Sequence, residues 1–108
     1  MEHMYYLRND KTGEITATSD IEAWERHHFE YMSRNIVKTE ICGDISVSTV
    51  FLGLNHNYFG GQPILFETMV FGGPLDGEQE RYETEAQARH GHVEMLRRVI
   101  EVLEEVKQ

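Results

Sequence analysis

The alternation of apolar and polar positions predicts a β-hairpin followed by a short helix at the start of the chain. Strands are expected at residues 5–8 and 14–18. The turn between them ends in Gly13, and glycine adopts a left-handed backbone conformation at little cost. Ser19 and Glu22 then form a capping box, which predicts a helix that ends near residue 33. Its apolar stripe consists of Ile21, Trp24, His28, Tyr31 and Met32.

A second hairpin is expected from the period-two pattern of residues 34–42 and 45–54. Gly43-Asp44 separates these strands, and a glycine at the first central position favours a type II′ turn. A further strand is predicted at residues 63–72, where successive side chains project to opposite faces of a sheet. One side carries Ile64, Phe66, Thr68 and Val70, and the other carries Leu65, Glu67, Met69 and Phe71.

The last third of the chain predicts a turn, an edge strand and a long helix. Residues 72–77 are rich in glycine and predict the turn, and residues 78–83 predict a short polar strand. Thr84 and Gln87 form a second capping box, which begins a helix that runs to about residue 106. Gly91 inside this helix costs about 1 kcal/mol relative to alanine. We therefore expect a strand to approach the helix closely at that position.

The predicted elements follow the order ββαβββ(β)α in one domain that spans residues 1–108. They define an α+β fold, in which an antiparallel sheet of about four to five strands carries two helices. Two helices normally cover one face of a sheet, yet the 63–72 strand is apolar on both sides. A second copy of the chain over the uncovered face, giving a homodimer, explains this mismatch. Cover by long loops and by the N-terminal hairpin explains it equally well.

Composition restricts the class of partner. Nineteen acidic residues against ten lysines and arginines give the 108-residue chain a formal net charge of −9, which repels phosphate backbones. We therefore expect no direct nucleic-acid binding, and a basic protein surface is the better match. Cys42 is the one cysteine, so no intrachain disulfide forms and a cytoplasmic location is expected. We expect neither a signal peptide nor a membrane-spanning segment, because the apolar runs are short and interrupted.

No short motif implies a reaction. A phosphate-binding loop with its lysine is missing, and so are the HxxxH and HExxH spacings of zinc sites. His90 and His92 fall on different faces of the long helix. Cys42 falls in a predicted strand without an assigned base, and Arg97-Arg98 is too small a basic patch for nucleic acid. These residues favour a protein that is not an enzyme and has no metal or other cofactor.

The loop between the 45–54 and 63–72 strands is the leading candidate for a binding site. Its eight residues, 55–62, exceed the roughly two to five of an ordinary hairpin connection. Tyr58 and Phe59 add aromatic surface that a turn does not need, and such rings stack on a base or anchor a protein partner. In the structural alternative, the rings fold back as a lid over the sheet. The candidate residues for ligand or partner binding are Asn55, His56, Asn57, Tyr58, Phe59 and Glu67.

Glu67 interrupts the apolar segment 65–71, and a buried carboxylate must be paired, hydrogen-bonded or protonated. Its candidate partners are His56, His92 and Arg81. Together with His56, and with Asp76 or Glu78, Glu67 could bind a divalent metal or act in an acid/base pair. A structural hydrogen bond is the simpler explanation.

The stretch STVFLGLNHNYFGGQPILFETMVFGGPLDGEQERY, residues 48–82, followed by Glu85-Ala86 and Gly91-His92, resembles a family of small uncharacterised proteins found in bacteriophages and actinobacterial genomes. The family pattern is TVFLGLDH, a glycine- and proline-rich loop, LFETMVFGG, an acidic turn and a helix with Gly-His. Asn55 stands where the family often has aspartate, which weakens a carboxylate metal site in the loop. The resemblance covers roughly the C-terminal half and brings no established activity. It implies a phage or mobile-element context, in which small acidic proteins often bind host factors.

The leading hypothesis is a phage- or mobile-element-type binding protein that inhibits a host defence or nucleic-acid-handling protein. It would use the 55–62 loop and the adjacent sheet, and its acidic surface would favour a basic target. The alternative is a small-ligand binder, for example a nucleotide sponge that uses Tyr58 or Phe59 for stacking and His56 for a polar contact. A metal-dependent enzyme that uses His56 and Glu67 is the third hypothesis.

Overall fold

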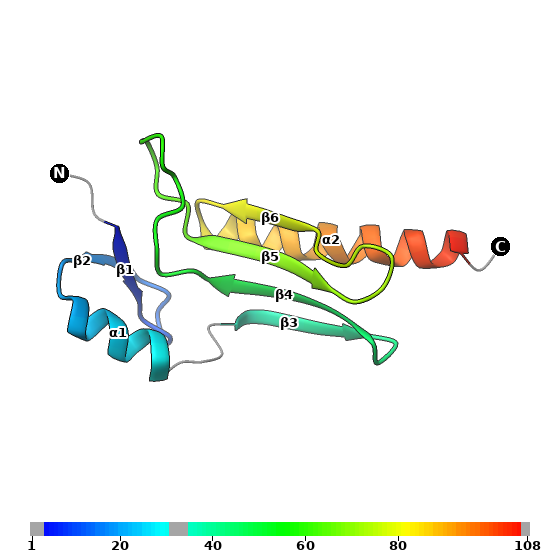
Figure 1. Cartoon of the computed structure of the whole chain (residues 1–108), viewed down its shortest axis with the longest axis horizontal. Coiled ribbons are helices and arrows are strands. Elements are labelled where there is room, and N and C mark those ends of the chain that lie inside the picture. The colour runs from blue at the N-terminus through cyan, green and yellow to red at the C-terminus, as the bar shows by residue number, and fades with distance from the viewer. Residues whose placement is uncertain (1–3, 31–34, 107–108) are drawn as a thin grey trace.

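The computed structural model describes residues 4–30 and 35–106 and has the α+β architecture expected from the sequence (Figure 1). Its elements are β1 (Tyr5–Arg8), β2 (Ile15–Thr18), α1 (Ile21–Glu30), β3 (Asn35–Ile41), β4 (Ile45–Phe51), β5 (Phe66–Phe71), β6 (Gln79–Tyr82) and α2 (Glu85–Val106). The predicted order of strands and helices is confirmed. The expected end of the first helix near residue 33 lies outside the described residues, as do Tyr31 and Met32 of its predicted stripe.

The strands form two antiparallel sheets. β1 and β2 pair with each other, whereas β3, β4, β5 and β6 form a meander in which each strand pairs with the next in sequence. A bridge between Tyr5 and Leu54 joins the first hairpin to the chain that leaves β4. The hairpin and α1 therefore lie beyond one end of the four-stranded sheet (Figure 1).

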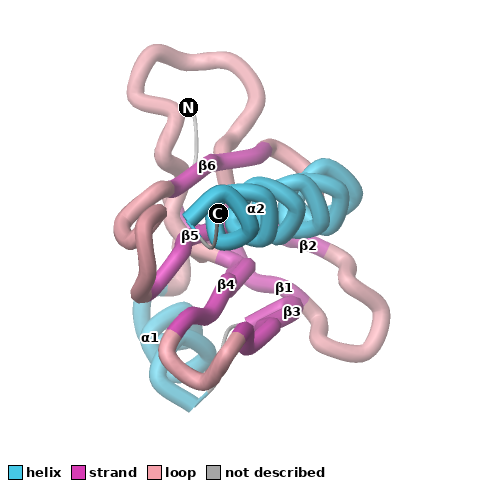
Figure 2. The backbone as a smooth tube through the Cα atoms, turned by 90° about the vertical axis from the view of Figure 1, so that its right-hand side faces the viewer, coloured by secondary structure: helices cyan, strands magenta, loops and turns pink. Residues whose placement is uncertain are grey.

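Helix α2 lies along one face of the four-stranded sheet (Figure 2). The core side chains come from this helix and from the strands. The core consists of Ile45, Val47, Val70, Met95 and Val99 in one cluster and of Phe51, Leu65, Phe66 and Ala88 in another. The rings of Phe51 and Phe66 meet edge to face, with centroids 5.6 Å apart. This face of the sheet is thus closed by the chain's own helix.

The second predicted capping box is confirmed, and the first is wrong by one residue. The Thr84 hydroxyl accepts a hydrogen bond from the Gln87 backbone N–H at 3.1 Å, and Gln87 Oε1 accepts one from the Thr84 N–H at 3.3 Å. At α1, Asp20 replaces Ser19 as the cap, because its carboxylate accepts the N–H of Ala23 at 3.0 Å. A carboxylate carries full charge and is favoured at the positive end of a helix.

The turn between β3 and β4 also differs from the prediction. Ile41 pairs with Ile45, so the turn contains three residues. Cys42 and Gly43 both have positive φ values, of 55° and 76°. A type II′ turn requires a positive φ at its first central position alone, so that prediction is wrong. Cys42 lies in this turn and is exposed, and its predicted place in a strand is wrong as well.

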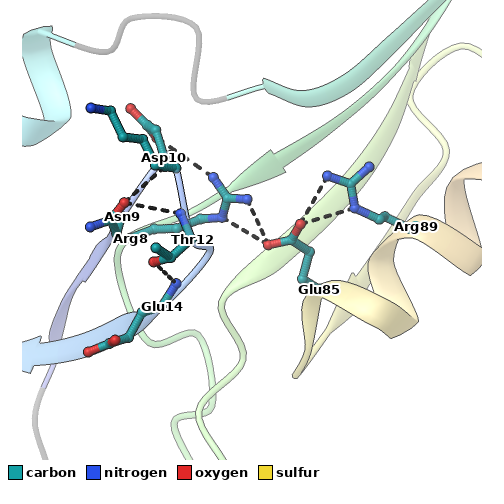
Figure 3. Close-up of polar contacts among 8 residues, drawn as sticks. Arg8, Asn9, Asp10, Thr12, Glu14, Glu85 and Arg89 are labelled. Atoms are coloured by element: carbon teal, nitrogen blue, oxygen red, sulfur yellow. Dashed lines mark hydrogen bonds and ion pairs between the residues drawn. The ribbon is translucent and has the colours of Figure 1, made fainter.

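Polar contacts hold the first hairpin and α1 against the remainder of the fold. Arg8 Nη2 lies 2.8 Å from Glu85 Oε1 at the start of α2, and Glu85 Oε2 lies 3.0 Å from Arg89 one turn later (Figure 3). Burial alone would raise the pKa of Glu85, but the hydrogen bonds and charges of the two arginines outweigh it and lower that pKa. Trp24 Nε1 on α1 donates to the Gly53 carbonyl at 3.0 Å.

The opposite face of the four-stranded sheet carries no helix among the described residues, because α1 packs against β1 (Figure 1). This helix-free face consists of Asn35, Lys38 and Glu40 of β3, Ser46, Ser48 and Val50 of β4, Glu67, Met69 and Phe71 of β5, and Gln79 and Arg81 of β6. The serines and the Glu67–Arg81 ion pair make this face mixed in polarity. Antiparallel sheets commonly leave one such face in water.

Candidate functional site

The loop between β4 and β5 extends beyond the sheet (Figure 1), and two asparagines hold its shape. Asn55 is buried, and its side-chain oxygen accepts the backbone N–H of Asn57 at 2.8 Å and that of Ile64 at 3.1 Å. The Asn57 side chain donates to the Gln62 carbonyl at 2.8 Å and accepts the Phe59 N–H at 3.2 Å. Both asparagines therefore order the loop through side-chain turns, as their residue type predicts.

Tyr58 and Phe59 lie in the middle of this loop and extend into solvent. Their exposed fractions are 71% and 99%. The alternative in which the rings form a lid over the sheet is therefore wrong. An exposed phenylalanine contributes no burial free energy to the fold, and an ordered loop loses less entropy when a partner binds. The loop thus presents preorganised aromatic surface.

His56 connects the loop to the helix-free face. Its ring Nδ1 lies 3.4 Å from the Tyr58 hydroxyl, and the two ring centroids are 6.1 Å apart. Burial lowers the pKa of His56, and the positive charge of Arg81 lowers it further, while the negative charge of Glu67 raises it. The ring is therefore neutral at pH 7. The charges of Glu67 on β5 and Arg81 on β6 therefore act on the His56 ring of the loop.

Glu67 is paired with one of its predicted partners. Its carboxylate Oε2 accepts a hydrogen bond from Arg81 Nε at 2.9 Å, across the β5–β6 pair. The Glu67 side chain is only 13% exposed, whereas the Arg81 side chain is 39% exposed. The carboxylate is therefore the more buried partner of the ion pair. His92, another predicted partner, lies on the opposite side of the sheet, under α2. The hydrogen bond from Arg81 therefore gives the Glu67 carboxylate the structural partner that its position requires.

The proposed metal set of His56, Glu67 and Asp76 or Glu78 is not brought together. Asp76 Oδ1 accepts the Gly72 N–H at 2.7 Å, and Glu78 Oε2 lies 3.5 Å from Arg98. In residues 4–30 and 35–106, no group of three or more histidine, cysteine, aspartate or glutamate side chains is placed to hold a metal ion. The arrangement at His56 suits hydrogen bonding and aromatic contact better than metal ligation.

A buried polar network under α2 escaped prediction. His92 is 3% exposed, and its two ring nitrogens lie 2.9 Å from the Thr39 hydroxyl and 2.7 Å from the Thr49 hydroxyl. Thr49 bonds Thr68 at 2.6 Å. The network therefore crosses β3, β4 and β5, and a neutral His92 satisfies it. Burial lowers the pKa of His92 and favours that neutral form.

Gly91, beside His92, leaves room for the Tyr82 ring beneath the helix. A Cβ at this position would overlap the hydroxyl and ring of Tyr82. The predicted close approach of a strand to Gly91 is thus confirmed, and the Tyr82 ring is its cause. Threonines at helix-facing strand positions were the available sequence signal for the network, but β-propensity alone also explains a threonine in a strand.

No known protein family, curated protein or solved structure matches this chain significantly. The resemblance to the phage and actinobacterial family therefore stays a prediction. In the part of the chain that the structure describes, no helix is both long and apolar enough to cross a membrane.

Proposed function

We propose that this protein acts by binding a host protein through the 55–62 loop and the adjoining helix-free face. The observation that carries the proposal is Phe59, which is 99% exposed in a loop that Asn55 and Asn57 hold in shape. Aromatic side chains dominate the energetics of protein interfaces, and fixing them before binding reduces the entropy lost on association. Such a ring has a role in contact and none in the fold.

The charge of the chain supports a basic target. A formal net charge of −9 accelerates encounter with a positively charged surface and disfavours nucleic acid. The phage or mobile-element context implied by the sequence resemblance adds a host defence or nucleic-acid-handling protein as the class of target. The free, exposed Cys42 is compatible with a reducing, cytoplasmic location.

Quantitative capture from bacterial lysate tests this proposal. The wild type is compared with the double variant Tyr58→Ser/Phe59→Ser, at low and moderate salt, and with Val93→Ser, which removes an exposed apolar side chain of α2 (61% exposed). We expect proteins retained by the wild type and by Val93→Ser to be lost with the double variant. With the purified target, the double variant should weaken binding about thirtyfold, as for an interface hot spot. Equal capture by all three proteins, or no reproducible capture, contradicts the proposal.

A small-ligand binder, such as a nucleotide-binding protein, is the second candidate. The Tyr58 hydroxyl beside His56 Nδ1, at 3.4 Å, supports it, because together they supply a stacking ring and a polar group. Nucleotides should then raise the melting temperature of the wild type, and Tyr58→Ala or His56→Ala should remove the shift. A shift that survives both substitutions places the ligand elsewhere. The enzyme hypothesis predicts turnover that Glu67→Gln abolishes while the fold survives.

A homodimer through the helix-free face is a separate part of the proposal. Phe71 is 49% exposed beside the half-buried Met69, and this apolar surface supports pairing with a second copy. Light scattering at micromolar concentration should give a dimer mass for the wild type and a monomer mass for Phe71→Glu. A monomer mass for the wild type overturns the dimer and leaves partner binding by the loop untouched.

A further inference from the structure

A cleft of about 390 Å³ lies between the first hairpin turn and α1, away from the 55–62 loop. Ligand pockets commonly range over roughly 300–1,000 Å³, so the cleft has the size for a small organic molecule. Its lining residues are Arg8, Asn9, Asp10, Lys11 and His27. The first four follow one another at the end of β1, and His27 belongs to α1.

The lining is basic in a chain that is otherwise acidic. Arg8 and Lys11 are the cationic residues of the lining, and Asp10 is its one acid. Arg81, Arg97 and Arg98 are all paired with carboxylates in the described part of the chain. Lys11 makes no ion pair with any residue that the structure describes. Its charge is therefore available to an anion.

Arg8 is held in place with part of its donor capacity unused. Its Nε and Nη2 bind Glu85 Oε1 at 2.9 Å and 2.8 Å, and Glu85 is itself held by Arg89 (Figure 3). The remaining Nη1 lies 3.6 Å from Asp10 Oδ1, which is too long for a hydrogen bond. The Arg8 side chain is only 14% exposed, so little rotamer freedom is left to lose. The guanidinium is thus oriented before any ligand arrives.

The turn fixes the backbone that follows Arg8 along the cleft. Asn9 Oδ1 accepts the N–H of Lys11 at 2.9 Å and that of Thr12 at 3.2 Å (Figure 3). Gly13 closes the turn, and its N–H donates to the Asn9 carbonyl at 2.7 Å. Lys11 therefore extends from an ordered turn, and only its side chain must be fixed on binding.

We propose that this cleft binds the phosphate monoester group of a small molecule, with Arg8 Nη1 and Lys11 Nζ donating to its oxygens. A phosphate monoester offers three acceptor oxygens and a charge of about −1.5 to −2 at pH 7, which suits a planar guanidinium together with an ammonium. The body of the ligand fills the remaining volume beside His27. This site is independent of the function proposed for the 55–62 loop.

Isothermal titration at low ionic strength tests the site with four probes: AMP, ribose 5-phosphate, inorganic phosphate and adenosine. We expect saturable binding of the phosphate-containing probes and none of adenosine. Tighter binding of AMP than of ribose 5-phosphate identifies a nucleotide, and equal binding of these two identifies recognition of the sugar phosphate alone. No saturable binding of any phosphorylated probe, or equal binding of adenosine and AMP, overturns the proposal.

Variants distinguish binding in this cleft from long-range electrostatic attraction of the ligand to the protein. Lys11→Ala should weaken binding about tenfold, the effect of losing one charge-assisted hydrogen bond. Lys38→Ala removes the same charge from an exposed position on β3 and should leave binding unchanged. Tyr58→Ser should also have no effect, so that failure here and failure of the loop proposal are distinguishable. Equal weakening by Lys11→Ala and Lys38→Ala would show long-range attraction only and would overturn the site.

Discussion

The buried network under α2 and the 55–62 loop use their polar and aromatic side chains in opposite ways. Under α2, polar groups are buried and paired, and His92 lies between the hydroxyls of Thr39 and Thr49. At the 55–62 loop, the amides are also paired, but Phe59 is 99% exposed. Buried and satisfied polar groups are the expected result of folding, whereas an exposed ring on an ordered loop is not. The first region is expected to stabilise the protein, and the second presents aromatic surface to solvent.

His92→Leu is expected to produce the largest effect. Leucine fills much of the volume but leaves the hydroxyls of Thr39 and Thr49 without their ring partner. The free energy of unfolding, measured by urea titration, should fall by roughly 2–4 kcal/mol. His90→Leu is the matched control, because His90 is exposed on the same helix, and it should change stability by less than about 0.5 kcal/mol. Similar losses of stability in both variants would show that the His92 network has no specific role in stabilising the fold.

Asn55→Ala is expected to have the next largest effect, and a local one. It removes the acceptor of the Asn57 and Ile64 N–H groups and should cost about 1–3 kcal/mol. Hydrogen exchange of these two amides should accelerate, and target binding should weaken because the loop is no longer ordered in advance. Gln62→Ala, which leaves the backbone acceptor of the loop in place, should change neither. Unchanged exchange in Asn55→Ala would show that the loop is ordered by other contacts.

Acidification should lower stability through both histidines, to a moderate extent. Burial lowers the pKa of His92 below its ordinary value of 6.5, so the unfolded chain takes up a proton more readily than the native protein. The contribution is complete above pH 6.5 and is lost as the pH falls toward the native pKa, by at most about 1.4 kcal/mol per pH unit for each group. His56 acts in the same direction.

Urea titrations between about pH 7.5 and 5.5, above the ordinary range of carboxylates, measure this slope. His92→Gln has no titrating ring and should show a smaller slope than the wild type, whatever its absolute stability. His56→Gln should likewise reduce it. Equal slopes in the wild type and His92→Gln would contradict a lowered native pKa for His92.

Phe59→Ser should have the smallest effect on stability. Its ring is exposed, so the free energy of unfolding should change by no more than about 0.5 kcal/mol. Thermal and urea unfolding measure this directly. A loss above about 1 kcal/mol would show that the ring supports the fold. The contrast between the buried network under α2 and the 55–62 loop would then disappear.

Local sequence signals predicted much of the fold. The order of the elements, the Thr84–Gln87 cap and the close approach at Gly91 all depend on neighbours in sequence or on one helix turn. Glu67 was predicted to need a partner because a carboxylate is costly among apolar neighbours, and Arg81 supplies it from the next strand. The position of the candidate loop followed from its length and its aromatic residues.

The features that were not predicted depend on contacts between residues that are far apart in sequence. His92 meets partners that lie 53 and 43 residues away in sequence, and no local pattern specifies such a pairing. The 63–72 strand was read as apolar on both sides because its own pattern contains nothing about β4, whose Ser46 and Ser48 make the helix-free face mixed. Whether Tyr58 and Phe59 fold inward or outward was likewise open, since both conformations satisfy the same loop sequence.

The bridge between Tyr5 and Leu54 and the pairing of Arg8 with Glu85 have a consequence for synthesis on the ribosome. The first hairpin leaves the exit tunnel well before the residues on which it docks, because Arg8 and Glu85 are 77 positions apart. The Tyr5–Leu54 bridge and the Trp24–Gly53 hydrogen bond need only the chain as far as residue 54, so they can form before β5, β6 and α2 have emerged. The Arg8–Glu85 pair forms only after the start of α2 has left the tunnel, so docking of the first hairpin is completed in two separate stages.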